Sequence, residues 1–295
     1  MRKKTIIMTV TLVFLIVFGI GVWLYSEHDT SPISHENMEK ELQEHSKDPN
    51  NPTEDDEQTN IGPLKPAEEI SKEFGETIQS TIQFFTGKQH RIVAIGDSLT
   101  QGVGDNTGQG GYVGILDKHL NADKTIVTIE NYGKRGNRTN QLLKRMEDPE
   151  IKQSLTNADI IIITIGANDI MQVVKENFTE ITYEIFSEER GQYEERLRKI
   201  FSTLQELNPD ASVYLVGFYN PFQQYFEHIK ELEMIVDDWN HTSNQVANDY
   251  GAIFIPTKDL FVTEEVNLFA DDHFHPNEYG YRRMAERILN YLVVD

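Results

Sequence analysis

A serine and a histidine, far apart in the chain, are the residues best suited to chemistry. Ser98 lies in a Gly-Asp-Ser-Leu segment, three residues after a short apolar stretch. His275 lies in an Asp-Asp-His-Phe-His-Pro segment, and Asp272 precedes it by three residues. A serine hydroxyl is a weak nucleophile unless a base takes its proton, and a histidine oriented by a carboxylate is an effective base. The two segments together predict nucleophilic attack by Ser98.

Each segment also has a simpler interpretation when it is taken alone. Ser98 suits the N-cap of a helix, and Asn277 suits the cap of the last helix. Two histidines and two aspartates within 271–275 suggest metal binding, although no further ligand group stands out. The serine segment is neither a Gly-x-Ser-x-Gly elbow nor a phosphate loop, which disfavours an ordinary α/β-hydrolase and a nucleotide site.

Two further segments contain groups that can stabilise an oxyanion. Asn168, in Gly-Ala-Asn-Asp, carries an amide donor, and Gly166, two residues before it, allows close backbone approach. Gly133 and Gly136 lie in Asn-Tyr-Gly-Lys-Arg-Gly-Asn-Arg-Thr and can offer a backbone N–H. Ordinary turns explain both segments when each is taken singly. The second segment is also a basic island, suited to solvation or to phosphate, with the cations Lys134, Arg135 and Arg138.

Alternating strands and helices must position these segments. Apolar stretches predict strands at 91–95, 125–130, 159–165, 212–217 and 252–255. Helical periodicity indicates helices at 66–87, 111–120, 138–156, 190–207, 227–249 and 277–292. This alternation predicts an α/β fold, a three-layer α/β/α sandwich with a five-stranded parallel sheet. Sites in such folds form at the carboxyl ends of the strands, and the polar segments fall there.

Taken together, the four segments resemble the SGNH, or GDSL-type, hydrolase superfamily, named for Ser, Gly, Asn and His in four ordered blocks. The resemblance covers about residues 90–292. The pattern is most similar to YpmR-like lipase/acylhydrolase proteins of Gram-positive bacteria. The resemblance implies a flavodoxin-like fold and hydrolysis of carboxylic esters without a cofactor or a metal.

The resemblance also implies a role for each matching residue. Ser98 would attack the ester carbonyl, His275 would take and return the proton, and Asp272 would orient His275. The oxyanion would be held by the backbone N–H groups of Ser98 and Gly136 and by the side chain of Asn168.

Two assignments and the substrate stay open. Gly133 and Asp271 are alternatives to the glycine and the aspartate just assigned. Aromatic residues in 218–226 and along 170–193, interpreted as a long connection, suit an acyl pocket with a lid, and simple packing at the rim explains them equally well. The implied substrate is an ester in a small molecule, a lipid or an acylated glycan.

Composition restricts the partners. The 295 residues carry a formal net charge of −21, which argues against nucleic acid because phosphate binding needs a basic surface. The absence of cysteine excludes disulfides and thiol nucleophiles.

The N-terminal segment predicts a membrane anchor. In 1–28, three basic residues precede twenty-one uncharged ones, which predicts one transmembrane helix with the rest of the chain outside the cytoplasm. A cleaved signal peptide with secretion is the alternative. An acidic flexible linker is expected at 29–65 and the hydrolase domain at 66–295. An anchored, non-catalytic envelope protein that binds a glycan or a partner through the same rim is the alternative function.

Overall fold

The computed structural model describes the part of the chain that contains all four segments. The described residues are Ile78, Thr81, Phe85 and the ranges 89–177, 182–220, 230–262 and 266–292. They belong to one compact unit, Leu64–Asp295. The expected anchor (1–28), the expected linker (29–65) and most of the expected helix at 66–87 lie outside the described residues. Within the described ranges, no helix has the length and apolar character needed to span a membrane.

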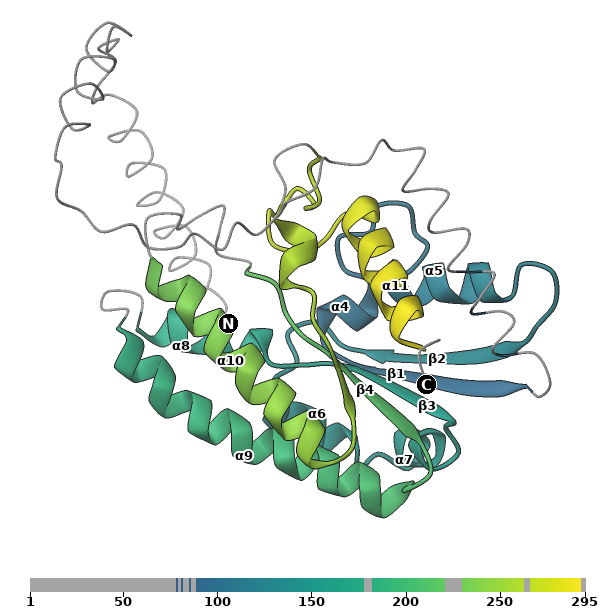
Figure 1. Cartoon of the computed structure of the whole chain (residues 1–295), viewed down its shortest axis with the longest axis horizontal. Helices are drawn as coiled ribbons and strands as arrows, with labels where there is room; N and C mark the ends of the chain where they lie inside the picture. The colour runs from purple at the N-terminus through teal and green to yellow at the C-terminus, as the bar shows by residue number, and fades with distance from the viewer. Residues whose placement is uncertain are drawn as a thin grey trace, which may run out of the picture. The chain divides into compact units, whose positions relative to one another are not determined.

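Five parallel strands form one sheet, in the order β2-β1-β3-β4-β5 (Figure 1). The strands are β1 (His90–Gly96), β2 (Val127–Gly133), β3 (Ile160–Thr164), β4 (Ser212–Val216) and β5 (Ile253–Ile255). The central strand β3 is buried on both faces, which explains its unbroken run of isoleucines. The five-stranded parallel sheet confirms the prediction. β2 extends beyond the expected end at residue 130 to Gly133, because its last residues pair with the end of β1.

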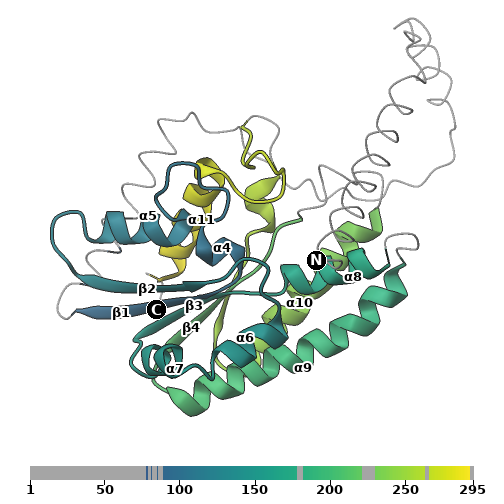
Figure 2. The same ribbon diagram turned by 180° about the vertical axis from the view of Figure 1, so that it is seen from behind.

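Helices cover both faces of this sheet (Figures 1 and 2). Alternate residues of a strand point to opposite faces, so Ile161 and Ile163 pack in one core and Ile160 and Ile162 in the other. The first core is covered by α6 (Thr139–Arg145), α7 (Pro149–Thr156), α8 (Ala167–Glu176), α9 (Tyr183–Leu207) and α10 (Lys230–Asp249). The second is covered by α5 (Gly111–Leu120), the 3₁₀ helix η1 (Lys258–Phe261) and α11 (Glu278–Leu292), with the short α4 (Ser98–Gln101). The described part is therefore a three-layer α/β/α sandwich.

Two expectations about helices were wrong. The single helix expected at 138–156 is divided into α6 and α7, because Pro149 starts α7 and the Asp148 side chain caps it. The long connection expected along 170–193 is mostly helical, since α8 continues to Glu176 and α9 begins at Tyr183. Apolar residues at helical spacing in both helices are buried in the core, which stabilises helix rather than loop.

Candidate active site

The fold brings Ser98 and His275 together at the carboxyl end of the sheet. The hydroxyl of Ser98 lies 2.9 Å from Nε2 of His275, and both residues are almost fully buried. On the other side of the ring, Nδ1 of His275 lies 2.6 Å from Oδ2 of Asp272. Asp272, and not the neighbouring Asp271, therefore contacts the histidine, and a continuous chain of contacts runs from carboxylate to imidazole to hydroxyl.

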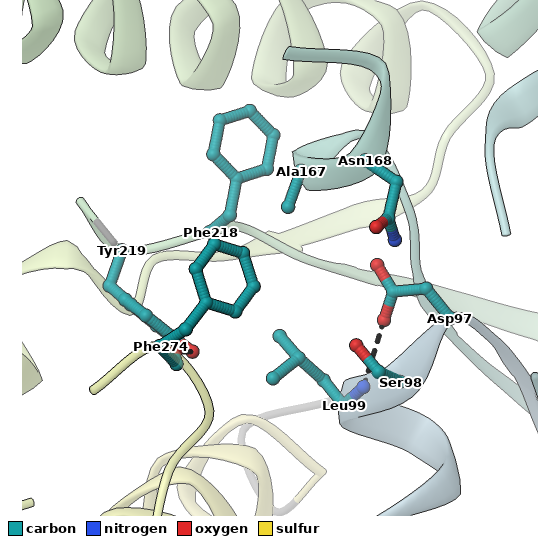
Figure 3. Close-up of a pocket in the computed structure, with 8 residues that line it drawn as sticks. All are labelled: Asp97, Ser98, Leu99, Ala167, Asn168, Phe218, Tyr219 and Phe274. Carbon is teal, nitrogen blue, oxygen red and sulfur yellow. Dashed lines mark hydrogen bonds between the residues drawn. The ribbon is translucent and has the colours of Figure 1, made fainter. Parts of the chain in front are cut away.

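The turn that carries the serine, residues 96–99 and here called the serine turn, is fixed by a buried polar network. Oδ1 of Asp97 accepts a hydrogen bond from the backbone N–H of Leu99 at 3.0 Å (Figure 3). The same oxygen accepts a second hydrogen bond from the hydroxyl of Thr164 at 2.8 Å. The Thr164 hydroxyl also lies 2.8 Å from that of Thr100, which lies 2.9 Å from that of Tyr112. Burial raises the pKa of Asp97 to about 7, although the hydrogen bonds from Leu99 and Thr164 oppose the rise. Sequence analysis did not identify this network.

The segment that carries the histidine, residues 270–277 and here called the histidine loop, is organised by its own carboxylate. Oδ1 of Asp272 accepts from the backbone N–H groups of Phe274 at 3.1 Å and His275 at 2.9 Å. Partial burial raises the pKa of Asp272, but hydrogen bonds from the backbone and ring of His275 and from Phe274 outweigh it and hold the pKa below its ordinary value. Tyr219, three residues after the end of β4, donates its hydroxyl proton to the carbonyl of Phe274 at 2.6 Å. This long-range contact was also missed.

Gly104 allows the segment after α4 to lie against the histidine loop. Its φ is +95°, and a Cβ there would come within 2.5 Å of the Pro276 carbonyl oxygen and 2.8 Å of the Cβ of His275. Only glycine combines that backbone conformation with so close an approach. Tyr281 ties the same segment to α11 through a 2.6 Å hydrogen bond to the carbonyl of Val103.

The predicted oxyanion donors come from the segments that follow β2 and β3. Asn168, the second residue of α8, donates from Nδ2 to the carbonyl of Asn137 at 3.1 Å and lines the same pocket as Ser98. The N–H of Gly133 is occupied, because it donates to Oδ1 of Asn131 at 2.8 Å. Gly136 adopts φ +77° in an exposed turn, and its N–H has no hydrogen-bond partner among the described residues.

Asp169, on α8, links the segment that follows β3 to the start of α6, which follows the segment containing Gly136. Its carboxylate accepts from the backbone N–H of Thr139 at 3.0 Å and from the Thr139 hydroxyl at 2.6 Å. Arg196 of α9 reaches the same two residues, at 2.7 Å from the Thr139 hydroxyl and 3.3 Å from Asp169. Burial raises the pKa of Asp169 against the opposing effect of these bonds. The cluster holds two of the four sequence segments at a fixed separation.

A mostly apolar pocket adjoins Ser98 (Figure 3). Its empty volume is about 290 Å³, including open solvent at its mouth, and its apolar walls come from Leu99, Ala167, Phe218, Tyr219 and Phe274. Phe218 and Tyr219 belong to the aromatic cluster predicted after the fourth strand, while residues 221–229 lie outside the described ranges. In the described ranges, no three His, Asp or Glu side chains converge as ligands for a metal ion would.

The described part of the chain is an α/β/α sandwich in which a serine, a histidine and an aspartate are in contact at the carboxyl end of the parallel sheet. This arrangement is typical of a hydrolase. The chain belongs to the GDSL-like lipase/acylhydrolase family, whose model matches residues 94–283, and it is therefore an enzyme of the ester hydrolase class. This confirms the resemblance drawn from the four sequence segments.

Individual relatives agree with this membership. The uncharacterized protein YpmR of Bacillus subtilis (strain 168) is 37% identical over 207 residues, which cover 68% of this chain and 81% of that protein. The spore germination lipase LipC of Bacillus licheniformis is 28% identical, covering 67% of this chain and 94% of the relative. Among solved structures, the lipase Lip_vut3 from a goat rumen metagenome matches with a TM-score of 0.60 and 25% identity, covering 68% of this chain and 96% of that one. An acetylxylan esterase from Geobacillus stearothermophilus shares the fold, with a TM-score of 0.54 and 20% identity, covering 70% and 95%.

Proposed function

We propose that the protein is a serine-dependent carboxylic ester hydrolase in which Ser98 is the nucleophile, His275 the general base and Asp272 the residue that orients the base. The observation that carries this proposal is the pair of contacts on the two sides of one imidazole, 2.9 Å to the serine hydroxyl and 2.6 Å to the carboxylate. That arrangement fits proton transfer from hydroxyl to ring while the carboxylate fixes the tautomer.

The reaction proceeds in two steps. Oγ of Ser98 attacks the ester carbonyl carbon while Nε2 of His275 takes the hydroxyl proton, and His275 then gives that proton to the departing alcohol. The acyl group is left on Ser98, and a water molecule activated by His275 releases it as a carboxylic acid. Asp272 remains ionised throughout and stabilises the imidazolium, in agreement with hydrogen bonds that lower its pKa.

Backbone and amide donors stabilise the negative oxygen that forms on attack. The N–H groups of Ser98 and Gly136 and the Nδ2 of Asn168 are the donors we assign. The N–H of Gly136, which has no partner among the described residues, supports this glycine over Gly133, whose N–H is already bound by Asn131. Replacement of Asn168 by alanine should lower kcat on the order of 100-fold or more.

The apolar pocket accommodates the acyl part of the ester. Its walls of leucine, alanine and aromatic side chains exclude a strongly polar acyl group, because unpaired polar atoms there would lose their hydration. The substrate is accordingly an ester with an apolar acyl group, carried by a lipid, an acylated glycan or a small molecule.

The serine mechanism is tested by Ser98→Ala and by a fluorophosphonate probe. The variant should lose p-nitrophenyl butyrate hydrolysis and probe labelling while its circular dichroism spectrum is unchanged. Ser202→Ala, on α9 and bonded only to the carbonyl of Lys199 in the described structure, is the matched control and should keep both. Undiminished hydrolysis in Ser98→Ala would overturn the proposal, and a folded wild-type protein that resists the probe would favour the non-catalytic envelope binder.

We also propose that the enzyme is held at the cell membrane by residues 1–28, with its hydrolase domain outside the cytoplasm. The support is the basic Arg2-Lys3-Lys4 flank before twenty-one uncharged residues. In a Gram-positive host, the full chain should stay in carbonate-washed membranes and should be degraded by protease added to protoplasts. Recovery of a shortened chain from the medium would instead establish a cleaved signal peptide.

A further inference from the structure

The loop after β2 and the helix that follows it carry an unusual concentration of positive charge. Residues 131–146 contain five cations and no acid, while residues 61–295 as a whole have a net charge of −15. One of the five, Arg145, is used structurally, since it donates to the backbone carbonyl of Tyr132 at 2.7 Å and to Oδ1 of Asn137 at 2.8 Å. Lys134 and Arg135 are exposed and form no salt bridge with any described residue.

The backbone of this loop is bonded directly to the serine turn and to α4. The N–H of Lys134 donates to the carbonyl of Gly96 at 3.0 Å, and the N–H of Arg135 donates to Oε1 of Gln101 at 2.5 Å. Gly96 begins the serine turn and Gln101 ends α4. The loop that carries Lys134 and Arg135 is therefore hydrogen-bonded to both ends of residues 96–101. These bonds place the backbone of both residues beside the serine turn.

The order of strands places this charge opposite the apolar pocket. β2 lies on one side of β1, whereas β3 and β4 lie on the other. The pocket takes Ala167 from the segment after β3 and Phe218 from the segment after β4, while the cations follow β2. The apolar pocket therefore lies on the β3 and β4 side of the serine turn, and the basic loop lies on the β2 side.

We propose that Lys134 and Arg135 bind an anionic group, a phosphate or a carboxylate, on the alcohol part of the ester that Ser98 cleaves. The acyl part occupies the apolar pocket, so the opposite side receives the leaving alcohol. An otherwise acidic domain repels anionic substrates, and a local positive surface beside the site reverses that repulsion at short range. This inference rests on the proposed serine hydrolase function and names the class of alcohol.

Arg138 is a weaker contributor to the same surface. It is half-buried, and the buried carboxylate of Asp169 interacts with it electrostatically, so part of its charge is already compensated. The test is therefore built on Lys134 and Arg135 alone.

The test compares two esters that differ by one phosphate. Wild-type kcat/KM for 1-butyrylglycerol 3-phosphate should exceed that for 1-butyrylglycerol by about tenfold at about 50 mM salt, and added salt should reduce this ratio. In the double variant K134Q/R135Q the ratio should fall about tenfold and should lose most of its salt dependence. The double variant K124Q/K152Q removes two exposed lysines that precede β2 and β3, at the other end of the sheet, and should keep the wild-type ratio.

A second pair, monopalmitoylglycerol and its 3-phosphate, distinguishes a lipid headgroup from a soluble phosphorylated alcohol. A phosphate preference on both pairs supports recognition of the anionic group itself, and a preference confined to the palmitoyl pair supports recognition of a lipid headgroup. Equal wild-type rates within both pairs, or a ratio that K134Q/R135Q and K124Q/K152Q change equally, would overturn the inference. Hydrolysis of the neutral esters that survives Ser98→Ala would instead overturn the serine mechanism.

Discussion

The serine turn and the histidine loop meet at a single 2.9 Å contact, yet they are held in place in different ways. The serine turn depends on residues distant in sequence, because Asp97 bonds to Thr164, 67 positions away, inside the core. The histidine loop depends mainly on local bonds, since the Asp272 side chain accepts from residues two and three positions after it. The Asp272 side chain is also 42% exposed, whereas Asp97 is 1% exposed.

This difference separates two kinds of carboxylate at one site. Burial dominates for Asp97 and raises its pKa to about 7, so the protonated form persists to a higher pH than in an ordinary aspartate. Hydrogen bonding dominates for Asp272 and lowers its pKa, so the ionised form is favoured. The first carboxyl group therefore serves the architecture of the turn, while the second can serve as a permanent anion beside the imidazole.

Among the changes that distinguish the serine turn from the histidine loop, Asp272→Asn has the largest expected effect. The asparagine oxygen can still accept from the backbone N–H groups of the loop, but its NH₂ group cannot accept a hydrogen bond from Nδ1 of His275. The tautomer with its proton on Nδ1, which leaves Nε2 free to act as the base, is then no longer favoured. We expect kcat for p-nitrophenyl butyrate to fall by roughly 10³ to 10⁴ while the free energy of unfolding changes by less than about 1 kcal/mol. Asp271→Asn is the matched control and should retain full activity, and equal losses in the two variants would contradict the assignment.

The next effect concerns Asp97→Asn and the pH dependence of stability. The folded pKa of about 7 lies above the ordinary value of 3.8, so the stabilisation from protonating Asp97 is complete below about pH 4 and is lost as the pH rises through 7. Wild type should therefore lose roughly 2–4 kcal/mol of unfolding free energy from this group between about pH 4 and pH 8.

The asparagine side chain of the Asp97→Asn variant still accepts hydrogen bonds from Leu99 and Thr164 but does not titrate. The unfolding free energy of the variant should therefore not fall with pH as that of the wild type does. Urea unfolding at several pH values between about 5 and 8 measures the difference. Asp210→Asn, an exposed change on the loop before β4, is the control and should follow the wild-type curve. Parallel curves for wild type and Asp97→Asn would show that the buried carboxyl group does not titrate in this range.

The contrast also explains what could be predicted from the sequence. Asp272 and His275 are three residues apart, so their contact is a property of one short segment and could be inferred from it. Ser98 and Asn168 each follow the end of a predicted strand by only a few residues. Because sites form at the carboxyl ends of parallel strands, the sequence predicted that these two residues lie in the same site.

Residues that act over long distances in sequence could not be found in that way. Thr164 ends an isoleucine-rich strand, where a threonine is as typical of β structure as of hydrogen bonding. Tyr219 stood in an aromatic cluster that packing alone explained. The choice between Gly133 and Gly136 depended on whether the Asn131 side chain occupies an N–H, which is a matter of side-chain geometry rather than spacing. The division of the helix expected at 138–156 had a signal in Pro149, but apolar periodicity continued across it.

Thr164→Val tests the buried network of the serine turn. Valine has nearly the same shape but removes the hydroxyl that lies 2.8 Å from both Oδ1 of Asp97 and the Thr100 hydroxyl, so each of these groups loses one of its buried partners. We expect the free energy of unfolding to fall by about 1–3 kcal/mol, because the partners lose a bond without regaining water. Thr156→Val removes an exposed hydroxyl on α7 and should change stability by less than about 0.5 kcal/mol. Equal changes in the two variants would show that the network contributes nothing beyond an ordinary surface hydroxyl.

Tyr219→Phe is expected to have the smallest effect and tests how local the histidine loop is. The change removes the 2.6 Å bond to the Phe274 carbonyl but keeps the ring, whose centroid lies 4.0 Å from that of Phe261. We expect a loss of about 1 kcal/mol in unfolding free energy, measured by urea denaturation.

The kinetic consequence should be small because Asp272 still holds His275 through bonds within the loop. We expect kcat to fall by roughly threefold, with KM unchanged within about twofold. Tyr279→Phe, on an exposed part of α11, is the control and should leave both quantities at their wild-type values. A fall in kcat as large as that of Asp272→Asn would mean that the histidine is positioned from β4, and the two halves of the site would then depend equally on the core.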